Sequence, residues 1–279
     1  MKPAICAPFD YETPLDRAIP MIRTAGFEVI SIGGRPRHPD YTSAAGRKTI
    51  RKLVKSGGLD IESVHAPFPE GDRLFSLDEA ERLESIRQCQ AALDAAAELE
   101  GRTVVIHLIQ PYGIPPGETR DRMVEAGRQS VEALADHAGS RGVKLALENG
   151  QRADYDAVLR DFLLEFKADH VGFCYDSGHE NVQGTCFKIL EEFGSRLLTV
   201  HIHDNLGSDT HLLPYEGNID WAKFRRVFFS LSYSGHLLLE SGLANSRFQE
   251  PERFLAEARE RAERIINGSG IPTADPHQE

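Results

Sequence analysis

Cysteine is scarce in this chain, and the few that occur stand far apart. The 279 residues include four, Cys6, Cys89, Cys174 and Cys186. Their spacing matches neither the close pairs of a structural zinc site nor the framework of a disulfide-rich secreted domain. The chain also has no run near the roughly 20 apolar residues of a membrane span, and no apolar stretch of signal-peptide length follows Met1. We therefore expect reduced thiols, a cytoplasmic location and no membrane partner.

Positive charge is also in short supply. Lys and Arg number 32 against 43 Asp and Glu, which gives a formal net charge of −11, and the basic residues form no run. Such a charge repels phosphate polymers and anionic lipid. A glycine-rich phosphate loop, a Gly-x-Ser-x-Gly elbow and a recognisable Cys–His nucleophile pair are absent as well. These absences argue against a nucleic-acid partner and favour a small molecule.

The sequence does contain a regular alternation of short apolar runs with longer amphipathic stretches, which is typical of a parallel α/β fold. The helical pattern is clearest over Leu77–Glu98 and Glu118–His137, where apolar residues recur every three or four positions. Eight strands are predicted, at Ala4–Phe9, Phe27–Ile32, Asp60–His65, Thr103–Leu108, Lys144–Glu148, His170–Asp176, Leu197–Asp204 and His236–Glu240. The chain length suits a barrel of eight such units, which needs about 250 residues.

The competing architecture is an open doubly wound sheet, which usually carries a glycine-rich turn after its first strand. Here that position reads Pro8-Phe9-Asp10. We therefore predict an α/β fold with a single (β/α)8 TIM barrel over residues 1–266 and an active site at the C-terminal ends of the strands. Residues 267–279 lose periodicity and gather Gly, Pro and polar groups, so we predict a loose C-terminal tail.

Residue types that bind metals end six consecutive predicted strands. They are His65, His107, Glu148, Asp176, His201 with His203, and Glu240. A barrel brings these strand ends to one mouth. Carboxylates buried after apolar runs such as LALE and LLLE are costly unless a cation or a partner offsets them. We therefore predict a divalent-metal site, and the mixture of His and carboxylate ligands favours Mn, Zn, Co or Fe over Ca or Mg.

Two neighbouring segments add polar side chains to this mouth. In DSGHE, His179 follows Asp176 by one helical turn, so it can bind a second metal or hold a substrate oxygen. In DTHLLPYEG, Asp209 and His211 lie two apart and share a face if the segment is extended. The candidates for substrate binding are His65, His107, His179 and Glu216. Strand alternation places His201 and His203 on one face, so either one can be the principal metal ligand.

Taken together, the motifs SVHAPF, VVIHL, ALEN, DSGH, HIHDN and DTHLLPYEG with a final LLLE resemble the xylose-isomerase-like TIM barrels. That superfamily includes sugar-phosphate isomerases and epimerases, hydroxypyruvate isomerase, ketose 3-epimerases and endonuclease IV. The resemblance implies one metal held by Glu148, Asp176, His201 or His203, and Glu240. It implies an enediolate reaction on a small sugar, sugar phosphate or related keto-polyol, with Glu148 and Glu240 as the acid/base pair and His179 holding a substrate hydroxyl.

The same resemblance supports a second activity, because endonuclease IV holds three zinc ions. Its ligand set would fall on His65, His107, Glu148, Asp176, His179, His201, Asp209, His211 and Glu240. This alternative is a multinuclear zinc phosphodiesterase acting on an abasic site or a small phosphoester, or a metal-dependent lyase. The negative net charge weighs against nucleic acid and favours the sugar enzyme, with one metal per chain and up to three as the upper bound. A non-catalytic barrel is a third hypothesis, which the complete set of ionisable residues disfavours, and the resemblance also allows a homodimer.

Overall fold

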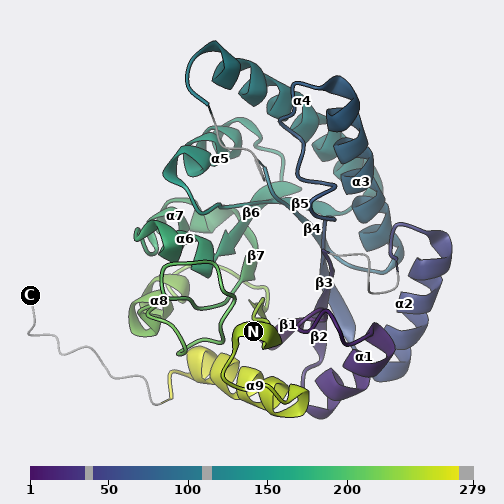
Figure 1. Cartoon of the computed structure of the whole chain (residues 1–279), viewed down its shortest axis with the longest axis vertical. Coiled ribbons are helices and arrows are strands. Elements are labelled where there is room, and N and C mark those ends of the chain that lie inside the picture. Colours follow the sequence, from purple (N-terminus) through teal and green to yellow (C-terminus); the bar gives the residue numbers. More distant parts are fainter. Residues whose placement is uncertain (35–39, 109–114, 270–279) are drawn as a thin grey trace, which may run out of the picture.

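Eight parallel strands form the inner wall of a barrel (Figure 1) in the computed structural model, which describes residues 1–34, 40–108 and 115–269. The strands are β1 (Pro3–Cys6), β2 (Val29–Gly33), β3 (Asp60–His65), β4 (Thr103–Ile106), β5 (Lys144–Glu148), β6 (Val171–Asp176), β7 (Leu197–His201) and β8 (Leu237–Leu239). Hydrogen-bonded neighbours follow the order β7-β6-β5-β4-β3-β2-β1-β8. A parallel bridge between Ile202 and Leu239 closes the ring, with Ile202 N donating to Leu238 O over 2.8 Å.

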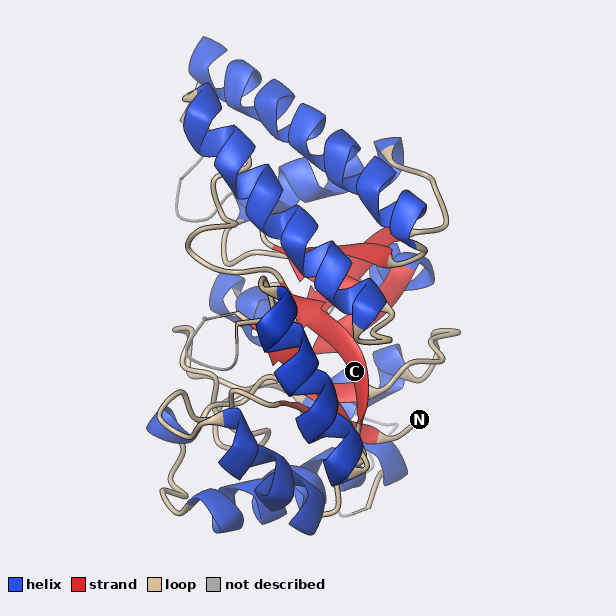
Figure 2. Cartoon of the chain, turned by 90° about the vertical axis from the view of Figure 1, so that its right-hand side faces the viewer, coloured by secondary structure: helices blue, strands red, loops and turns tan. Residues whose placement is uncertain are grey.

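Helices cover the outside of this wall, as Figures 1 and 2 show. They are α1 (Leu15–Thr24), α2 (Ala44–Gly57), α3 (Glu79–Glu98), α4 (Glu118–Arg141), α5 (Ala153–Glu165), α6 (Ser177–Gln183), α7 (Lys188–Phe193), α8 (Trp221–Phe228) and α9 (Pro251–Asn267), with short 3-10 turns at Gly194–Arg196 and Leu243–Asn245. The long helices α3 and α4 lie side by side. In the described part of the chain, no helix is long and apolar enough to span a membrane.

Apolar side chains fill two separate spaces. The larger core lies between the sheet and the helices and includes Phe27, Phe162 and Phe224. The interior of the barrel holds mainly small residues, in clusters around Cys6 and around Cys174. This layering is usual for a barrel whose centre is packed rather than open.

The predicted single barrel is confirmed, and β3 and β5 have the predicted bounds. Strand β7 ends at His201, three residues before the predicted end, because the following residues pair only as isolated bridges. Helix α3 begins at Glu79 because the Asp78 side chain caps it, and α4 runs on to Arg141, where Gly142 adopts the left-handed conformation that ends it. Helix α9 extends one residue into the predicted tail, and residues 270–279 lie outside the described residues.

A β-bulge turns one carboxylate into the barrel. Ile30 and Ser31 of β2 pair with Ile61 and Ser63, so Glu62 is an extra residue on β3. Its Oε1 accepts a hydrogen bond from Thr199 Oγ1 over 3.3 Å, and Thr199 lies on β7 across the interior. A cavity of about 510 Å³ reaches Glu62 from the N-terminal end of the strands. Burial raises the pKa of Glu62 to about 7, so its neutral form is favoured in the folded state.

Replacing Glu62 by Gln should therefore remove a pH-dependent cost. Because its pKa is raised on folding, Glu62 adds most to the stability of the wild-type protein below the unfolded pKa near 4.5, where the carboxyl is protonated. This stability is lost as the pH rises through about 7 and the buried carboxyl ionises. Relative to wild type, the free energy of unfolding of Glu62→Gln should increase by up to about 3 kcal/mol between pH 5 and pH 8. Urea unfolding of both chelated proteins at the two pH values measures this difference. Glu100→Gln, which removes an exposed carboxylate from the same cavity, is the control, and a pH-independent difference for Glu62→Gln would contradict the assignment.

Candidate metal centre and active site

Four predicted ligands meet at the C-terminal ends of neighbouring strands. Glu148 ends β5, Asp176 ends β6, His201 ends β7 and Glu240 follows β8, and one ligand atom from each lies within 4.8 Å of the others. His201 Nδ1 lies 2.6 Å from Glu148 Oε1 and 3.1 Å from Glu240 Oε2. The first three residues are fully buried. This is a compact set of three carboxylates around one imidazole.

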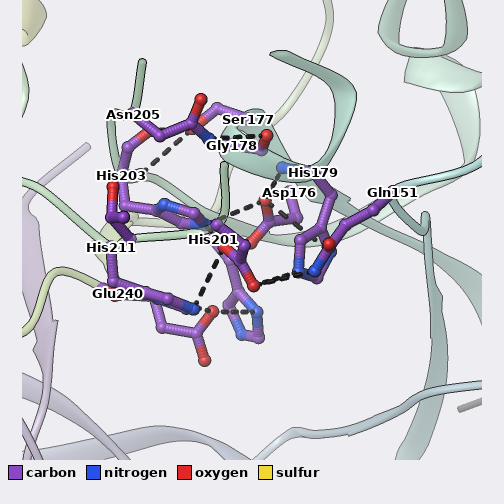
Figure 3. A network of polar contacts seen from close by, with 12 residues as sticks. Gln151, Asp176, Ser177, Gly178, His179, His201, His203, Asn205, His211 and Glu240 are labelled. Carbon is purple, nitrogen blue, oxygen red and sulfur yellow. Dashed lines mark hydrogen bonds and ion pairs between the residues drawn. The ribbon is translucent and has the colours of Figure 1, made fainter. Parts of the chain in front are cut away.

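His201 and His203, which the sequence could not tell apart, occupy different places. His203 Nε2 lies 3.0 Å from Asp176 Oδ1, and the His203 ring stacks on His211 with centroids 4.0 Å apart (Figure 3). It joins Asp176 and His179 in one group of metal-binding type and His211 with Asp209 in another. The four-residue group with both glutamates contains His201 instead.

His65 and His107 approach Glu148 from the other side. Their Nε2 atoms lie 3.5 Å and 3.2 Å from Glu148 Oε2. On the far edge of its ring, His107 Nδ1 lies 3.0 Å from Asp72 Oδ1. Burial alone would lower the pKa of His107, but the hydrogen bonds that its ring donates to the carboxylates of Asp72 and Glu148 raise it to about 10. Asp72 lies in a loop with no strand-end signal, and the sequence analysis did not find it.

The third part of the cluster comes from α6 and from the loop after β7. Asp176 caps α6 by accepting a hydrogen bond from His179 N over 2.6 Å. His179 Nδ1 lies 2.8 Å from the carbonyl oxygen of Asn149, so this nitrogen carries the proton and Nε2 faces Asp209 Oδ2 at 3.5 Å. His211 is arranged in the same way, with Nδ1 on the Glu240 carbonyl oxygen at 2.7 Å and Nε2 3.4 Å from Asp209 Oδ1.

Electrostatics keep the carboxylates ionised in spite of their burial. Burial favours the neutral acid, yet the charge and hydrogen bond of His201 hold the pKa of Glu240 at about 2 and that of Glu148 well below its usual range. The carboxylates in turn raise the pKa of His201 and His179 well above the usual value, against the effect of burial. Protons on the imidazoles therefore balance this negative charge, and a divalent cation can take their place because metal ligation requires neutral imidazole.

The cluster opens into a cavity of about 470 Å³ at the same end of the barrel. His65, His211 and Glu240 line it on one side, and Phe9 and Phe68 supply apolar wall. A volume of this size is typical of small-ligand sites, which combine apolar walls with a few polar groups.

Residues 19–264 match the family described as Xylose isomerase-like TIM barrel. The chain belongs to this family. Among its relatives, fructoselysine 3-epimerase of Escherichia coli O157:H7 is 26% identical over 267 residues, which cover 91% of this chain and 94% of the relative. D-psicose 3-epimerase of Enterocloster bolteae is 24% identical over 83% of this chain and 76% of its own. A solved structure of a D-tagatose 3-epimerase-like protein shares the fold, with a TM-score of 0.78 at 22% identity over 96% and 97% of the two chains.

In this xylose isomerase-like barrel, Glu216, which the sequence predicts to bind substrate, lies apart from the cluster of metal-binding residue types. Its side chain accepts hydrogen bonds from Leu213 N and Ser246 Oγ, and its Oε1 lies 3.9 Å from Arg261 Nη1. Glu216 does not line the cavity beside the metal centre. These contacts tie its loop to α9, and the role of Glu216 in substrate binding stays a prediction.

Asn149, which directly follows Glu148, holds the backbone of a neighbouring ligand. Its Nδ2 donates to Asp176 O over 2.9 Å, and its Oδ1 accepts from Asp176 N over 2.7 Å. Gln151, on the same loop, donates from Nε2 to Asp209 Oδ2 over 2.8 Å. The segment after β5 thus holds the backbone of Asp176 and the carboxylate of Asp209, and residues that support metal ligands commonly make such contacts.

Replacing Asn149 by Ala should destabilise the protein strongly for an amide-to-methyl change. Two buried backbone groups of Asp176 would lose their partner, so the free energy of unfolding of the chelated protein should fall by about 2–4 kcal/mol. Asn218→Ala, which removes an amide that accepts only from the Asn181 side chain, should cost less than about 1 kcal/mol. Urea unfolding of the two variants makes the comparison, and equal losses would show that the Asn149 contacts carry no special weight.

Proposed function

We propose that this protein is a divalent-metal-dependent epimerase or isomerase of a small sugar, with Glu148 and Glu240 as its acid/base pair. One observation carries the proposal. The two glutamates come from β5 and β8, three strands apart around the barrel, yet both carboxylates lie within 3.1 Å of His201 Nδ1. Two carboxylates that converge from separate strands suit proton removal on one side of a carbon and proton return on the other. The sugar 3-epimerases among the relatives support the same reaction class.

The residues present fit a metal at Glu148, Asp176, His201 and Glu240. Three mostly buried carboxylates with oxygen atoms within 4.8 Å of one another repel. A cation bound among them relieves this repulsion. Carboxylate oxygens mixed with imidazole suit Mn, Zn, Co or Fe, and we propose one ion per chain at this group. When bound, the ion supplies positive charge next to the carbonyl and adjacent hydroxyl of a sugar, which eases removal of the proton between them.

The protein's own side chains supply the proton transfers. Glu148 and Glu240 are held ionised, so either can accept a proton from carbon and the other can return one. His179 directs Nε2 toward Asp209, and we propose that it holds a substrate hydroxyl there. His65 and His107 lie against Glu148 and can bind further substrate oxygens. The partner we propose is a small-molecule sugar in the cytoplasm, and the homodimer remains a prediction from the resemblance.

Solvent deuterium tests this proposal. Chelated protein reloaded with Mn²⁺ or Co²⁺ should convert a member of a panel of D-psicose, D-fructose and D-tagatose to its epimer in D₂O, with one deuterium gained at the epimerised carbon by NMR. Glu148→Gln and Glu240→Gln should each lower this exchange by about 10²–10⁴-fold. Glu100→Gln, which removes an exposed carboxylate at the N-terminal end of the barrel, is the control and should stay near wild type. Exchange that survives in either of the first two variants would exclude the paired-glutamate mechanism.

A specific observation keeps the second candidate function under test. His65 joins Glu148 in one group of metal-binding type, and Asp209 joins His203 and His211 in another, so the mouth has side chains for more than one ion. A multinuclear zinc phosphodiesterase or a lyase would need those ions. The net charge of −11 favours the sugar enzyme, because phosphate polymers would be repelled.

Metal content decides between the two candidates. Protein purified without chelator should hold about one ion per chain, and His65→Ala and Asp209→Ala should leave that number unchanged if only the four-residue group is occupied. Elemental analysis of the three proteins gives the answer. Two or three zinc ions that fall in the variants would favour the phosphodiesterase and direct the assays to abasic DNA and small phosphoesters.

A further inference from the structure

One buried carboxylate outside the metal centre binds a whole loop. Asp204 lies three residues beyond the end of β7 and is fully buried. Its Oδ1 accepts hydrogen bonds from Asn205 N at 2.9 Å and Ile219 N at 3.2 Å. Its Oδ2 accepts from Tyr215 N and from the indole Nε1 of Trp221, both at 2.9 Å. Each oxygen thus takes two donors, and together they satisfy this buried charge.

These donors enclose the segment 205–219, which we name the clamp loop. The backbone of Asp204 also pairs with Leu212 in both directions, at 2.8 Å and 2.9 Å, so the chain between them is held closed. Gly217 packs so tightly on Asp204 that a Cβ there would lie 2.2 Å from the Asp204 carboxylate. The clamp loop therefore takes its shape from the carboxylate of Asp204.

The clamp loop carries site residues at its tip. Asp209 meets His179 and Gln151 there, and Thr210 and His211 line the 470 Å³ cavity. The four-residue metal group, in contrast, comes from β5, β6, β7 and β8 and includes no residue of the loop. A change at Asp204 should therefore disturb the cavity wall more than the metal group.

We propose that Asp204 is a positioning residue, which holds Asp209 beside His179 and His211 in the wall of the substrate cavity by binding the amides of the clamp loop. Its kinetic consequence rests on the proposed function, but its structural consequence does not. The carboxylate acts as a fixed acceptor, so an asparagine can satisfy only part of the same donor set. Asp204→Asn would leave two N–H donors facing an amide NH₂.

The chain contains a built-in reporter for this arrangement, because Trp221 is its single tryptophan. The indole is buried, and its N–H donates directly to Asp204. Acrylamide quenching of the fluorescence therefore measures access to the clamp loop without substrate or metal. Glu180 offers a matched control, because it is equally buried and lies next to His179 on α6. It accepts hydrogen bonds from Phe187 N and Ile189 N and makes none to the clamp loop.

The experiment compares wild type, Asp204→Asn and Glu180→Gln. For Asp204→Asn we expect acrylamide quenching of Trp221 to rise about twofold or more, metal per chain to stay unchanged, and KM for the ketose to rise about tenfold with kcat altered less than about threefold. Glu180→Gln should match wild type in all of these. Unchanged quenching in a folded Asp204→Asn protein, or an equal rise of KM in Glu180→Gln, would overturn the proposal.

A second variant covers the case in which Asp204→Asn fails to fold. Gly217→Ala keeps the carboxylate and the tryptophan but forces the clamp loop away from Asp204, so it should raise quenching and KM in the same direction. Its failure to do so would also overturn the proposal. If wild type turns over no ketose, the proposed function is contradicted, and quenching with metal content still decides the role of Asp204.

Discussion

The mutual repulsion of three carboxylates at the mouth of the barrel is the constraint that organises this site. Glu148 and Asp176 are fully buried, and the side chain of Glu240 is 19% exposed. Such a group is stable only while positive charge lies among its members. His201 stands at the centre of that charge, in contact with both glutamates, and His203 provides the matching contact for Asp176. Protonated imidazoles or a bound cation can therefore each offset the negative charge of the carboxylates, which explains why several histidines lie at these strand ends.

A second ring of polar groups fixes which nitrogen each imidazole presents. The carbonyl oxygens of Asn149 and Glu240 accept from the Nδ1 atoms of His179 and His211, so both Nε2 atoms face Asp209. Asp72 does the same for His107, whose other nitrogen meets Glu148. Partners of this kind set tautomer and ring orientation and so determine the geometry of the inner groups. Asp204 extends the principle from single rings to a whole loop.

The residues at the strand ends could be predicted from the sequence because a parallel barrel brings the C-terminal ends of all its strands to one face. Every metal-binding type placed there by the sequence does reach the mouth. The choice between His201 and His203 could not be made by alternation, because β7 stops at His201 and the chain beyond it bends to bridge β8. The inward position of Glu62 could not be predicted for a similar reason, because a bulge turns its side chain to the face opposite to the one that a regular strand would give it.

The roles of Asp72 and Asp204 could not be predicted for a different reason. Asp72 contacts His107, which is far away in the sequence, and Asp204 binds donors spread over a long segment. No periodic pattern in the sequence marks either residue. For Glu216, likewise, no pattern in the sequence indicates which way its carboxylate faces, and in the fold it lies near Arg261 of α9. The position of a loop side chain cannot be predicted until the conformation of the loop is known. What the sequence predicts best is therefore the part of the site that the sheet holds.

Small residues inside the barrel leave room for the charged groups of the site. Two positions before Glu148, Asp176 and His201 on the same strand faces stand Ala146, Cys174 and Thr199, all fully buried. Alternation places these side chains in the layer directly beneath the site. Bulky apolar residues there would push the glutamate and imidazole groups outward and apart. Small side chains in this layer let the charged groups above them meet at the axis, so the packing of the barrel interior and the chemistry of its mouth are set by the same strands.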